Sequence, residues 1–291
     1  MSPRPGPRTS RLLILLLAVV LATGLATTVV SAAALPPCQV ADVTTAHRQA
    51  TDWYRSVLDT TYRLTSAYSP TGLRSTSYAG LNGRHRVRAL VIGDLRVMAR
   101  AARAAGARLA VQSAYRSYAT QRSTFDYWVR VQGYATALKE SARAGHSEHQ
   151  LGTAIDFRSY GGSAPWSYQD WGRTKAGTWL RNNAWKYGFV MSYPKGKTSV
   201  TCYAYEPWHY RYVGRKTAAA IRASGLTLRE YLWRNQTTLV STPTPTPTPV
   251  VEPTPVADPT PVAPTPVTDP TPVADPTPVA EPTPAEPTSA G

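Results

Sequence analysis

The sequence predicts an α+β fold with a small, mainly antiparallel sheet flanked by helices. Three observations predict it. Apolar residues recur at helical spacing in several stretches, shorter stretches alternate as strands do, and the two kinds are interspersed along the second half of the chain. Helices followed by short strands among further helices are typical of α+β domains.

Six stretches are predicted to be helices, and apolar side chains recur at helical spacing in residues 87–102. The six stretches are residues 41–67, 87–102, 117–131, 179–185, 215–223 and 227–233. The second has the clearest pattern, and Gly106 follows it where a C-cap belongs. In the third, Phe125, Trp128 and Val129 are expected to face inward.

Four short stretches are predicted to be strands. They are residues 108–112, 153–157, 189–193 and 200–205. The last two are expected to pair across a turn around Gly196, because glycine and lysine separate two runs rich in aromatic and β-branched residues.

Residues 35–240 have the composition of one compact domain. All eight Trp and all 17 Tyr lie there, which excludes a wholly disordered chain. Of the 32 Lys and Arg, three are in residues 1–34 and none is in 241–291, whereas six of the 17 Asp and Glu are in 241–291. The middle region therefore has 29 basic and 11 acidic residues, a net charge of +18.

The first 34 residues have the pattern of a secretory signal. Arg4, Arg8 and Arg11 precede an apolar run, and small residues follow it up to Ala34. The alternative is an uncleaved anchor, since residues 12–30 are just long enough to span a bilayer. Either reading places the domain outside the cytoplasm.

Residues 241–291 form a Pro/Thr-rich tail with 17 of the 26 prolines. A repeated hexapeptide begins at Glu252, and alternating prolines remove backbone donors, so an extended polyproline II state is expected. The tail is interpreted either as a spacer along a cell wall or as a disordered appendage without a specific partner.

The two cysteines, Cys38 and Cys202, are consistent with one disulfide in an exported chain. Such a bond would tie the mature N-terminus to a point close to Glu206. The alternative is two unpaired thiols.

The histidines offer a candidate metal site. Asp156 lies among apolar residues of a predicted strand, and a buried carboxylate needs a partner. His149 precedes it by seven residues across a turn at Gly152, and the sequence Glu206-Pro-Trp-His209 adds a second histidine. Two His, one carboxylate and an open position are typical of catalytic zinc, with Glu206 beside it as a base. The alternative is that Asp156 pairs with one of the many arginines.

Three motifs, in order, resemble one known family. Ser113-Ala-Tyr-Arg-Ser resembles its S-x-Y-R-S segment, and residues 147–156 resemble S-x-H-x-x-G-x-A-x-D. Residues 188–197 lead into Glu206-Pro-Trp-His, like its closing signature. The chain is thus similar, over about residues 69–214, to the VanY-like D-alanyl-D-alanine carboxypeptidases, a family of zinc metallopeptidases.

The resemblance implies roles for particular residues. The zinc ligands it implies are His149, Asp156 and His209. Glu206 would be the general base and then carry the proton to the leaving amine, and Arg116 would stabilise the oxyanion. Gln121 and Ser147 would contact the substrate.

Three further positions bear on this assignment. Cys202 stands where the family often has Gly. His146 is three residues before His149, but the resemblance leaves it outside the metal set. Glu148 is expected to point away from the site toward the surface.

The predicted organisation is a signal peptide (1–34), an N-terminal helical extension (35–68), a carboxypeptidase-like catalytic domain (69–240) and the disordered tail (241–291). The expected function is zinc-dependent removal of the C-terminal D-alanine from peptidoglycan stem peptides, outside the cell or at the wall. Alternatives are an endopeptidase or L,D-carboxypeptidase with the same zinc site, or a catalytically silent wall-binding module. Anionic wall polymers are expected as partners of the basic domain, nucleic acid is not, and a membrane only if the leader stays uncleaved.

Overall fold

The structure is a computed structural model that describes Met1 and residues 34–236. The predicted leader and tail therefore lie outside the described residues, apart from Met1 and Ala34. Among the described residues, no helix combines the length and the apolar composition that a bilayer crossing needs.

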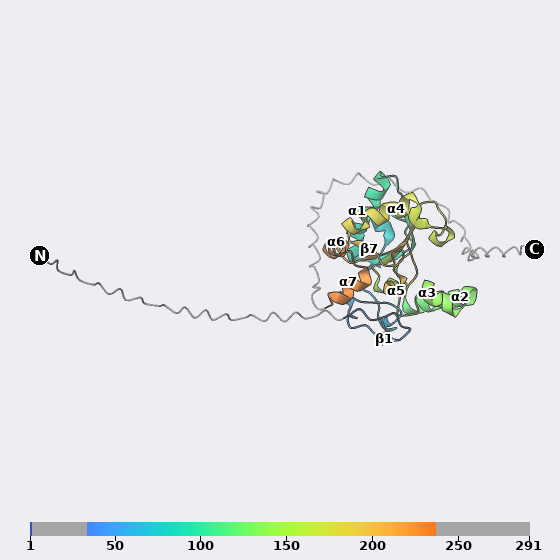
Figure 1. Ribbon diagram of the computed structural model, residues 1–291. Coiled ribbons are helices and arrows are strands. Elements are labelled where there is room, and N and C mark those ends of the chain that lie inside the picture. The colour runs from blue at the N-terminus through green and yellow to red at the C-terminus, as the bar shows by residue number, and fades with distance from the viewer. Residues whose placement is uncertain (2–33, 237–291) are drawn as a thin grey trace, which may run out of the picture. The chain divides into compact units, whose positions relative to one another are not determined.

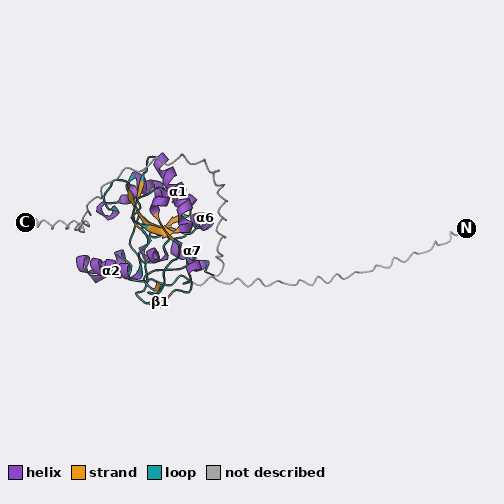
Figure 2. Cartoon of the chain, turned by 180° about the vertical axis from the view of Figure 1, so that it is seen from behind, coloured by secondary structure: helices purple, strands orange, loops and turns teal. Residues whose placement is uncertain are grey.

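A four-stranded antiparallel sheet lies at the centre of the domain (Figures 1 and 2). Its strands run in the order β5, β6, β8 and β7. They are Leu109–Ser113, Ala154–Ser159, His209–Tyr212 and Phe189–Met191, respectively. The small antiparallel sheet and the helices around it confirm the predicted α+β class.

The alternation of side chains along the strands gives the sheet two different faces. On β8, Tyr210 and Tyr212 belong to the main hydrophobic core, whereas His209 and Arg211 alternate with them and so face the other way. On β6, Ile155 and Phe157 join the same core. Asp156 and His209 are direct partners in the register, so the second face brings two candidate metal ligands together.

Helix α1, Ala89–Ala104, covers the core face of the sheet. Its buried residues include Val91, Leu95 and Met98, spaced three or four apart as predicted. Leu180 of α4, Lys175–Asn183, joins the same core. In both views β1 (Val43–Thr44) and α2 (Tyr118–Gln132) lie on the opposite side of the sheet from α1 (Figures 1 and 2).

The remaining elements are short. The strands are β1 (Val43–Thr44), β2 (Tyr62–Arg63), β3 (Leu73–Ser75) and β4 (Arg86–Arg88). The α-helices are α2 (Tyr118–Gln132), α3 (Tyr134–Glu140), α5 (Thr198–Thr201), α6 (Arg215–Ser224) and α7 (Leu228–Arg234). The 3-10 helices are η1 (Ala50–Asp52), η2 (Thr76–Ala79), η3 (Glu148–Leu151), η4 (Pro165–Ser167), η5 (Trp171–Arg173) and η6 (Ala184–Tyr187).

Two predicted elements are wrong. Residues 41–67 are not a helix: they contain β1, η1 and β2, and many of their polar side chains are buried against the rest of the domain. Residues 200–205 are not a strand, because α5 ends at Cys202 with a left-handed backbone, φ 71°. The strand that pairs with β7 is β8 instead. Tertiary contacts, rather than local propensity, decide both segments.

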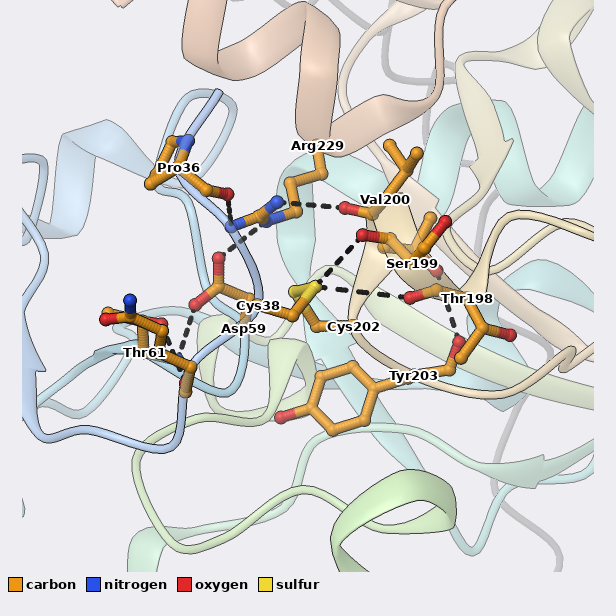
Figure 3. Close-up of a disulfide and its surroundings, with 12 residues drawn as sticks. Pro36, Cys38, Asp59, Thr61, Thr198, Ser199, Val200, Cys202, Tyr203 and Arg229 are labelled. Atoms are coloured by element: carbon orange, nitrogen blue, oxygen red, sulfur yellow. Dashed lines mark hydrogen bonds and ion pairs between the residues drawn. A yellow bond between two sulfur atoms is a disulfide. The ribbon is translucent and has the colours of Figure 1, made fainter. Parts of the chain in front are cut away.

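The N-terminal segment, residues 35–68, is tied covalently to the domain. Cys38 and Cys202 form the predicted disulfide, with Cα atoms 5.3 Å apart (Figure 3). Cys202 occupies a backbone region that favours glycine, which gives a physical reason for the glycine expected at this position. The disulfide closes a loop across a sequence separation of 164 residues.

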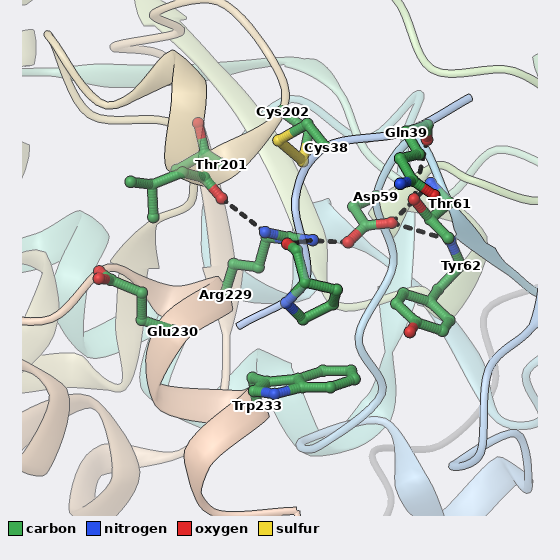
Figure 4. Close-up of polar contacts among 12 residues, drawn as sticks. Cys38, Gln39, Asp59, Thr61, Tyr62, Thr201, Cys202, Arg229, Glu230 and Trp233 are labelled. Atoms are coloured by element: carbon green, nitrogen blue, oxygen red, sulfur yellow. Dashed lines mark hydrogen bonds and ion pairs between the residues drawn. A yellow bond between two sulfur atoms is a disulfide. The ribbon is translucent and has the colours of Figure 1, made fainter. Parts of the chain in front are cut away.

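A buried ion pair lies beside the disulfide (Figure 4). The Nε of Arg229 is 2.6 Å from Oδ2 of Asp59, and the two side chains are 6% and 0% exposed. Arg229 also donates to the backbone oxygens of Pro36 and Val200. The other Asp59 oxygen accepts from the backbone N–H groups of Thr61 and Tyr62. Both charges are therefore compensated, as burial demands.

Candidate active site

The three predicted metal ligands come together at the face of the sheet opposite the main hydrophobic core. The ligand atoms of His149, Asp156 and His209 all lie within 4.8 Å of one another, and the three residues are buried. His149 Nε2 is 3.1 Å from Asp156 Oδ2, and His209 Nδ1 is 2.9 Å from Asp156 Oδ1. His149 comes from η3, whereas Asp156 and His209 come from paired strands.

The second nitrogen of each histidine has an acceptor of its own. His149 Nδ1 is 2.6 Å from the carbonyl oxygen of Ala114, and His209 Nε2 is 3.0 Å from Oε2 of Glu148. His149 Nε2 is buried and lies 3.1 Å from Asp156 Oδ2, but the pair does not have hydrogen-bond geometry, and the atom has no other partner among the described residues. Burial first, and then the charge of Arg116, lower the pKa of His149 to about 4. A neutral imidazole with a free inward lone pair fits a divalent metal such as zinc.

Glu148 is part of this site, which corrects the expectation that it points to the surface. It is 4% exposed. It accepts hydrogen bonds from His209, from the Ser192 hydroxyl at 2.6 Å and from Arg211 at 2.9 Å. Burial raises the pKa of Glu148, but Arg211 and the hydrogen bonds lower it to about 2. Arg211 is two residues from His209 on β8, so both side chains lie on the same face of the strand. A cation buried there needs a carboxylate partner, and this requirement was the sequence signal that could have identified Glu148.

His209 is strongly basic without a metal. Burial lowers its pKa, but hydrogen bonds to Asp156 and Glu148 outweigh burial and raise it to about 10. Nδ1 faces Asp156, while Nε2 faces Glu148. A carboxylate behind a ligating histidine orients the ring and increases its basicity as a ligand.

Glu206 lies next to the three candidate ligands and is not part of that set. Its Oε2 is 3.7 Å from His209 Nδ1. Burial raises the pKa of Glu206 to about 8, and the nearby His209 charge opposes that rise. A carboxyl group whose pKa is close to neutral can both take up and release a proton.

Arg116 approaches the site from the end of β5. Its Nη1 is 3.4 Å from Asp156 Oδ2 and 2.6 Å from Ser113 Oγ. Its Nε donates to Gln121 Oε1 at 2.8 Å, and Gln121 Nε2 donates to the Ala142 oxygen. The alternative partner foreseen for Asp156, an arginine, is thus present beside the two histidines.

The two predicted substrate contacts have local partners in the structure. Gln121 is 1% exposed, and its side-chain oxygen accepts a hydrogen bond from Arg116 Nε. The Ser147 hydroxyl caps η3 by accepting from the His149 backbone N–H. Contact of either residue with a substrate stays a prediction.

An open cleft of about 380 Å³ leads to the site. Arg116, Asp156 and Glu206 contribute to its wall. The other lining residues are mainly aromatic and polar: Ser113, Thr124, Trp128, Glu140, Trp166, Tyr168, Gln169, Asp170, Trp171, Ala204, Tyr205, Pro207 and Trp208. A peptide in this cleft would meet Arg116, Glu206 and one of the three candidate ligands, Asp156.

The N-terminal segment supports the loop that carries His149. His146 makes hydrogen bonds to the Asp59 oxygen and to Asp42, so it faces away from the metal set. Gln150 donates to the Thr65 and Tyr68 oxygens. These contacts fix the loop on both sides of the metal ligand.

A buried His, Asp and His set on η3 and two paired strands, with a carboxyl beside it, defines a metallopeptidase-type site. The family model described as VanY, D-alanyl-D-alanine carboxypeptidase, matches residues 84–215. The chain belongs to the VanY-like D-alanyl-D-alanine carboxypeptidase family of zinc metallopeptidases. The predicted resemblance is thereby confirmed.

Three relatives show the extent of the similarity. YodJ of Bacillus subtilis (strain 168) is 44% identical over 137 residues, which are 47% of this chain and 50% of YodJ. The structure of the LdcB LD-carboxypeptidase has a TM-score of 0.57 at 33% identity, covering 66% of this chain and 94% of that one. A variant of the vancomycin-resistance D,D-pentapeptidase VanY with Zn(II) has a TM-score of 0.53 at 31% identity, covering 62% and 99%. The chain spans about half the length of the curated relatives that it matches first.

Proposed function

We propose that this chain is an exported zinc peptidase that removes the C-terminal D-alanine from peptidoglycan stem peptides. The observation that carries the proposal is the convergence of His149, Asp156 and His209 next to Glu206 in an open cleft. Membership of a zinc metallopeptidase family supports it. The predicted leader supports export.

His149, Asp156 and His209 would hold the zinc ion. When bound there, zinc would lower the pKa of the attacking water and polarise the scissile carbonyl. The two histidines are pre-oriented for this by Ala114 and Glu148, so little rearrangement is needed when the metal enters.

Glu206 would serve as the base. Its carboxylate takes one proton as the oxygen of water bonds to the carbonyl carbon. It then gives that proton to the amide nitrogen as the C–N bond breaks, which releases the amine of free D-alanine. The buried setting that raises the pKa of Glu206 suits both transfers.

Arg116 would stabilise the negative charge that develops on the carbonyl oxygen. Its guanidinium lines the cleft and is held by Ser113 and Gln121, so it is oriented before the substrate arrives. Fixed positive charge in a partly buried site is most effective when no reorganisation accompanies the reaction.

A second candidate is an L,D-carboxypeptidase with the same site. The similarity to the LdcB LD-carboxypeptidase, at 33% identity, favours it. The two candidates differ in the bond cut: a pentapeptide ending in D-Ala-D-Ala for one, and a tetrapeptide ending in a single D-Ala for the other.

The test uses the exported chain with zinc and these two synthetic stem peptides. Released D-alanine is followed by mass spectrometry, with a chelator and the Glu206→Gln variant as controls. Release from the pentapeptide that both controls abolish is the expected result. Release from the tetrapeptide alone would replace the first candidate by the second, and release from neither would overturn both.

A further inference from the structure

A second cavity adjoins the catalytic cleft. It has a volume of about 540 Å³ and is bordered by α4, β7, α6 and α7. We call it the basic groove. Its floor is apolar and includes the buried side chains of Leu180, Phe189, Ile221 and Leu228. It lies toward the core face of the sheet, so it is separate from the metal ligands.

Positive charge surrounds the basic groove. Its lining includes five cations, all exposed: Arg173, Arg181, Lys195, Lys197 and Arg222. Among the described residues, Arg173, Arg181 and Arg222 have no ion-pair partner. The guanidinium group is suited to phosphate because its donors form a planar fork and it is weakly hydrated.

One carboxylate, Asp170, lies among the described lining residues, and it is already engaged. It is 3.3 Å from Lys195 Nζ and 3.4 Å from the Tyr205 hydroxyl, and it accepts from the Gly172 backbone N–H. Asp170 therefore compensates Lys195 and leaves the arginines on the groove wall uncompensated.

A buried polar atom also faces the basic groove. The hydroxyl of Tyr210 has no hydrogen-bond partner among the described residues, and the residue is 1% exposed. Tyr210 lines the groove together with Arg181 and Tyr205. A buried hydroxyl without a partner is costly, so a ligand oxygen that accepts from it would remove that cost.

The basic groove and the catalytic cleft are continuous in their walls. Asp170 and Tyr205 line both of them. A polymer that presents a peptide to Glu206 and Arg116 can therefore place another part of itself against Arg181 and Tyr210.

We propose that the basic groove binds a phosphate group of a phosphate-bearing wall polymer. The phosphate accepts hydrogen bonds from the Tyr210 hydroxyl and from the arginines, and the carbon skeleton next to it packs on the apolar floor. The donors come from three separate elements, α4, β8 and α6, and a phosphate offers several oxygen atoms to accept from them. The proposed function supplies only the choice of a wall polymer as the source.

Calorimetry with the full exported chain tests this proposal. The probe is a short glycerol-phosphate oligomer, with inorganic phosphate as the free-anion comparison. The double variant Arg181→Gln with Arg222→Gln should weaken oligomer binding about tenfold or more. The reason is that each charge-assisted hydrogen bond that is lost raises the dissociation constant several-fold or more. Tyr210→Phe should weaken it several-fold while keeping the ring. Inorganic phosphate should bind more weakly than the oligomer.

A matched control separates the groove from the overall charge. Arg100→Gln with Arg130→Gln removes the same charge from exposed positions outside the groove lining. Its oligomer affinity should stay within about twofold of the parent, since exposed charges at a distance are screened by salt. Equal weakening in both double variants would mean diffuse attraction and would overturn the proposal.

The tail of the same chain is the competing occupant, because it has six carboxylates and no Lys or Arg. A synthetic peptide with the sequence of residues 252–263 is therefore titrated as well. Tighter binding of this peptide than of the oligomer, lost in the groove variant, would assign the groove to the tail and overturn the proposal. All titrations are repeated with Glu206→Gln, which lacks the proposed catalytic base. Binding to the basic groove is then measured independently of peptidase activity, so the two proposals can fail separately.

Discussion

The Nε2 atom of His209 lies 3.0 Å from Oε2 of Glu148, on the side of the imidazole opposite Asp156. Glu148 is in turn held by Ser192 and Arg211. The carboxylate therefore fixes which histidine nitrogen faces the metal ligands. Glu148 acts through His209 as a positioning residue and does not touch the cleft.

Glu148→Gln should weaken zinc binding about 10- to 100-fold, which is the usual loss when a carboxylate behind a ligating histidine is removed. Competition with a chromophoric chelator measures the affinity. The control is Asp126→Asn, because Asp126 is exposed and takes part in no ion pair among the described residues. Unchanged zinc affinity in Glu148→Gln would show that Asp156 and the strand position alone hold His209.

Glu206→Gln should lower kcat by about 10²–10⁴, because an amide cannot accept the proton of the attacking water. Zinc stoichiometry should stay at the parent value, since Glu206 is not one of the three ligands. The two readouts are D-alanine release and metal content of the purified protein. A variant that loses zinc along with activity would make Glu206 a ligand and contradict the proposed role.

Arg116→Lys should lower kcat about 10²–10³-fold, a loss typical of one oxyanion donor. The lysine keeps the charge, but it loses the guanidinium fork that Ser113 and Gln121 hold. Steady-state kinetics on the stem peptide separates kcat from KM. A rise in KM with unchanged kcat would instead assign Arg116 to ground-state binding.

Removing the disulfide should lower the free energy of unfolding by about 2–5 kcal/mol, the usual cost for a small exported domain. Cys38→Ala with Cys202→Gly should be about 1–2 kcal/mol more stable than Cys38→Ala with Cys202→Ala, because φ at this position is 71°. Urea unfolding of the metal-free protein measures both values. Equal stability of the two double variants would contradict backbone strain at residue 202.

Much of the site follows from local patterns in the sequence. The three candidate metal ligands, Glu206 and Arg116 lie in short motifs whose residue types and spacing are dictated by the chemistry. These residues can therefore be recognised as candidates from the sequence. The α+β class was predictable for a similar reason. Helix α1 has an uninterrupted apolar stripe, and such a stripe depends only on its own residues.

The two wrong predictions concern segments whose structure depends on residues far away in the sequence. Residues 41–67 carry spaced apolar residues, yet their fold is set by partners far along the chain, such as the disulfide at Cys202 and the ion pair at Arg229. The strand next to β7 begins at His209 rather than near residue 200, because the pairing depends on which segment presents Tyr210 and Tyr212 to the core.

Local sequence patterns single out the candidate residues for the chemistry, because a zinc ligand or a base must be a particular residue type at a particular spacing. How those residues are supported depends on the tertiary structure. Glu148 faces inward because Arg211 and His209, more than 60 positions away, bring a buried cation and an imidazole to it. A charge is buried only where its partners are, and those partners are brought together by the whole fold.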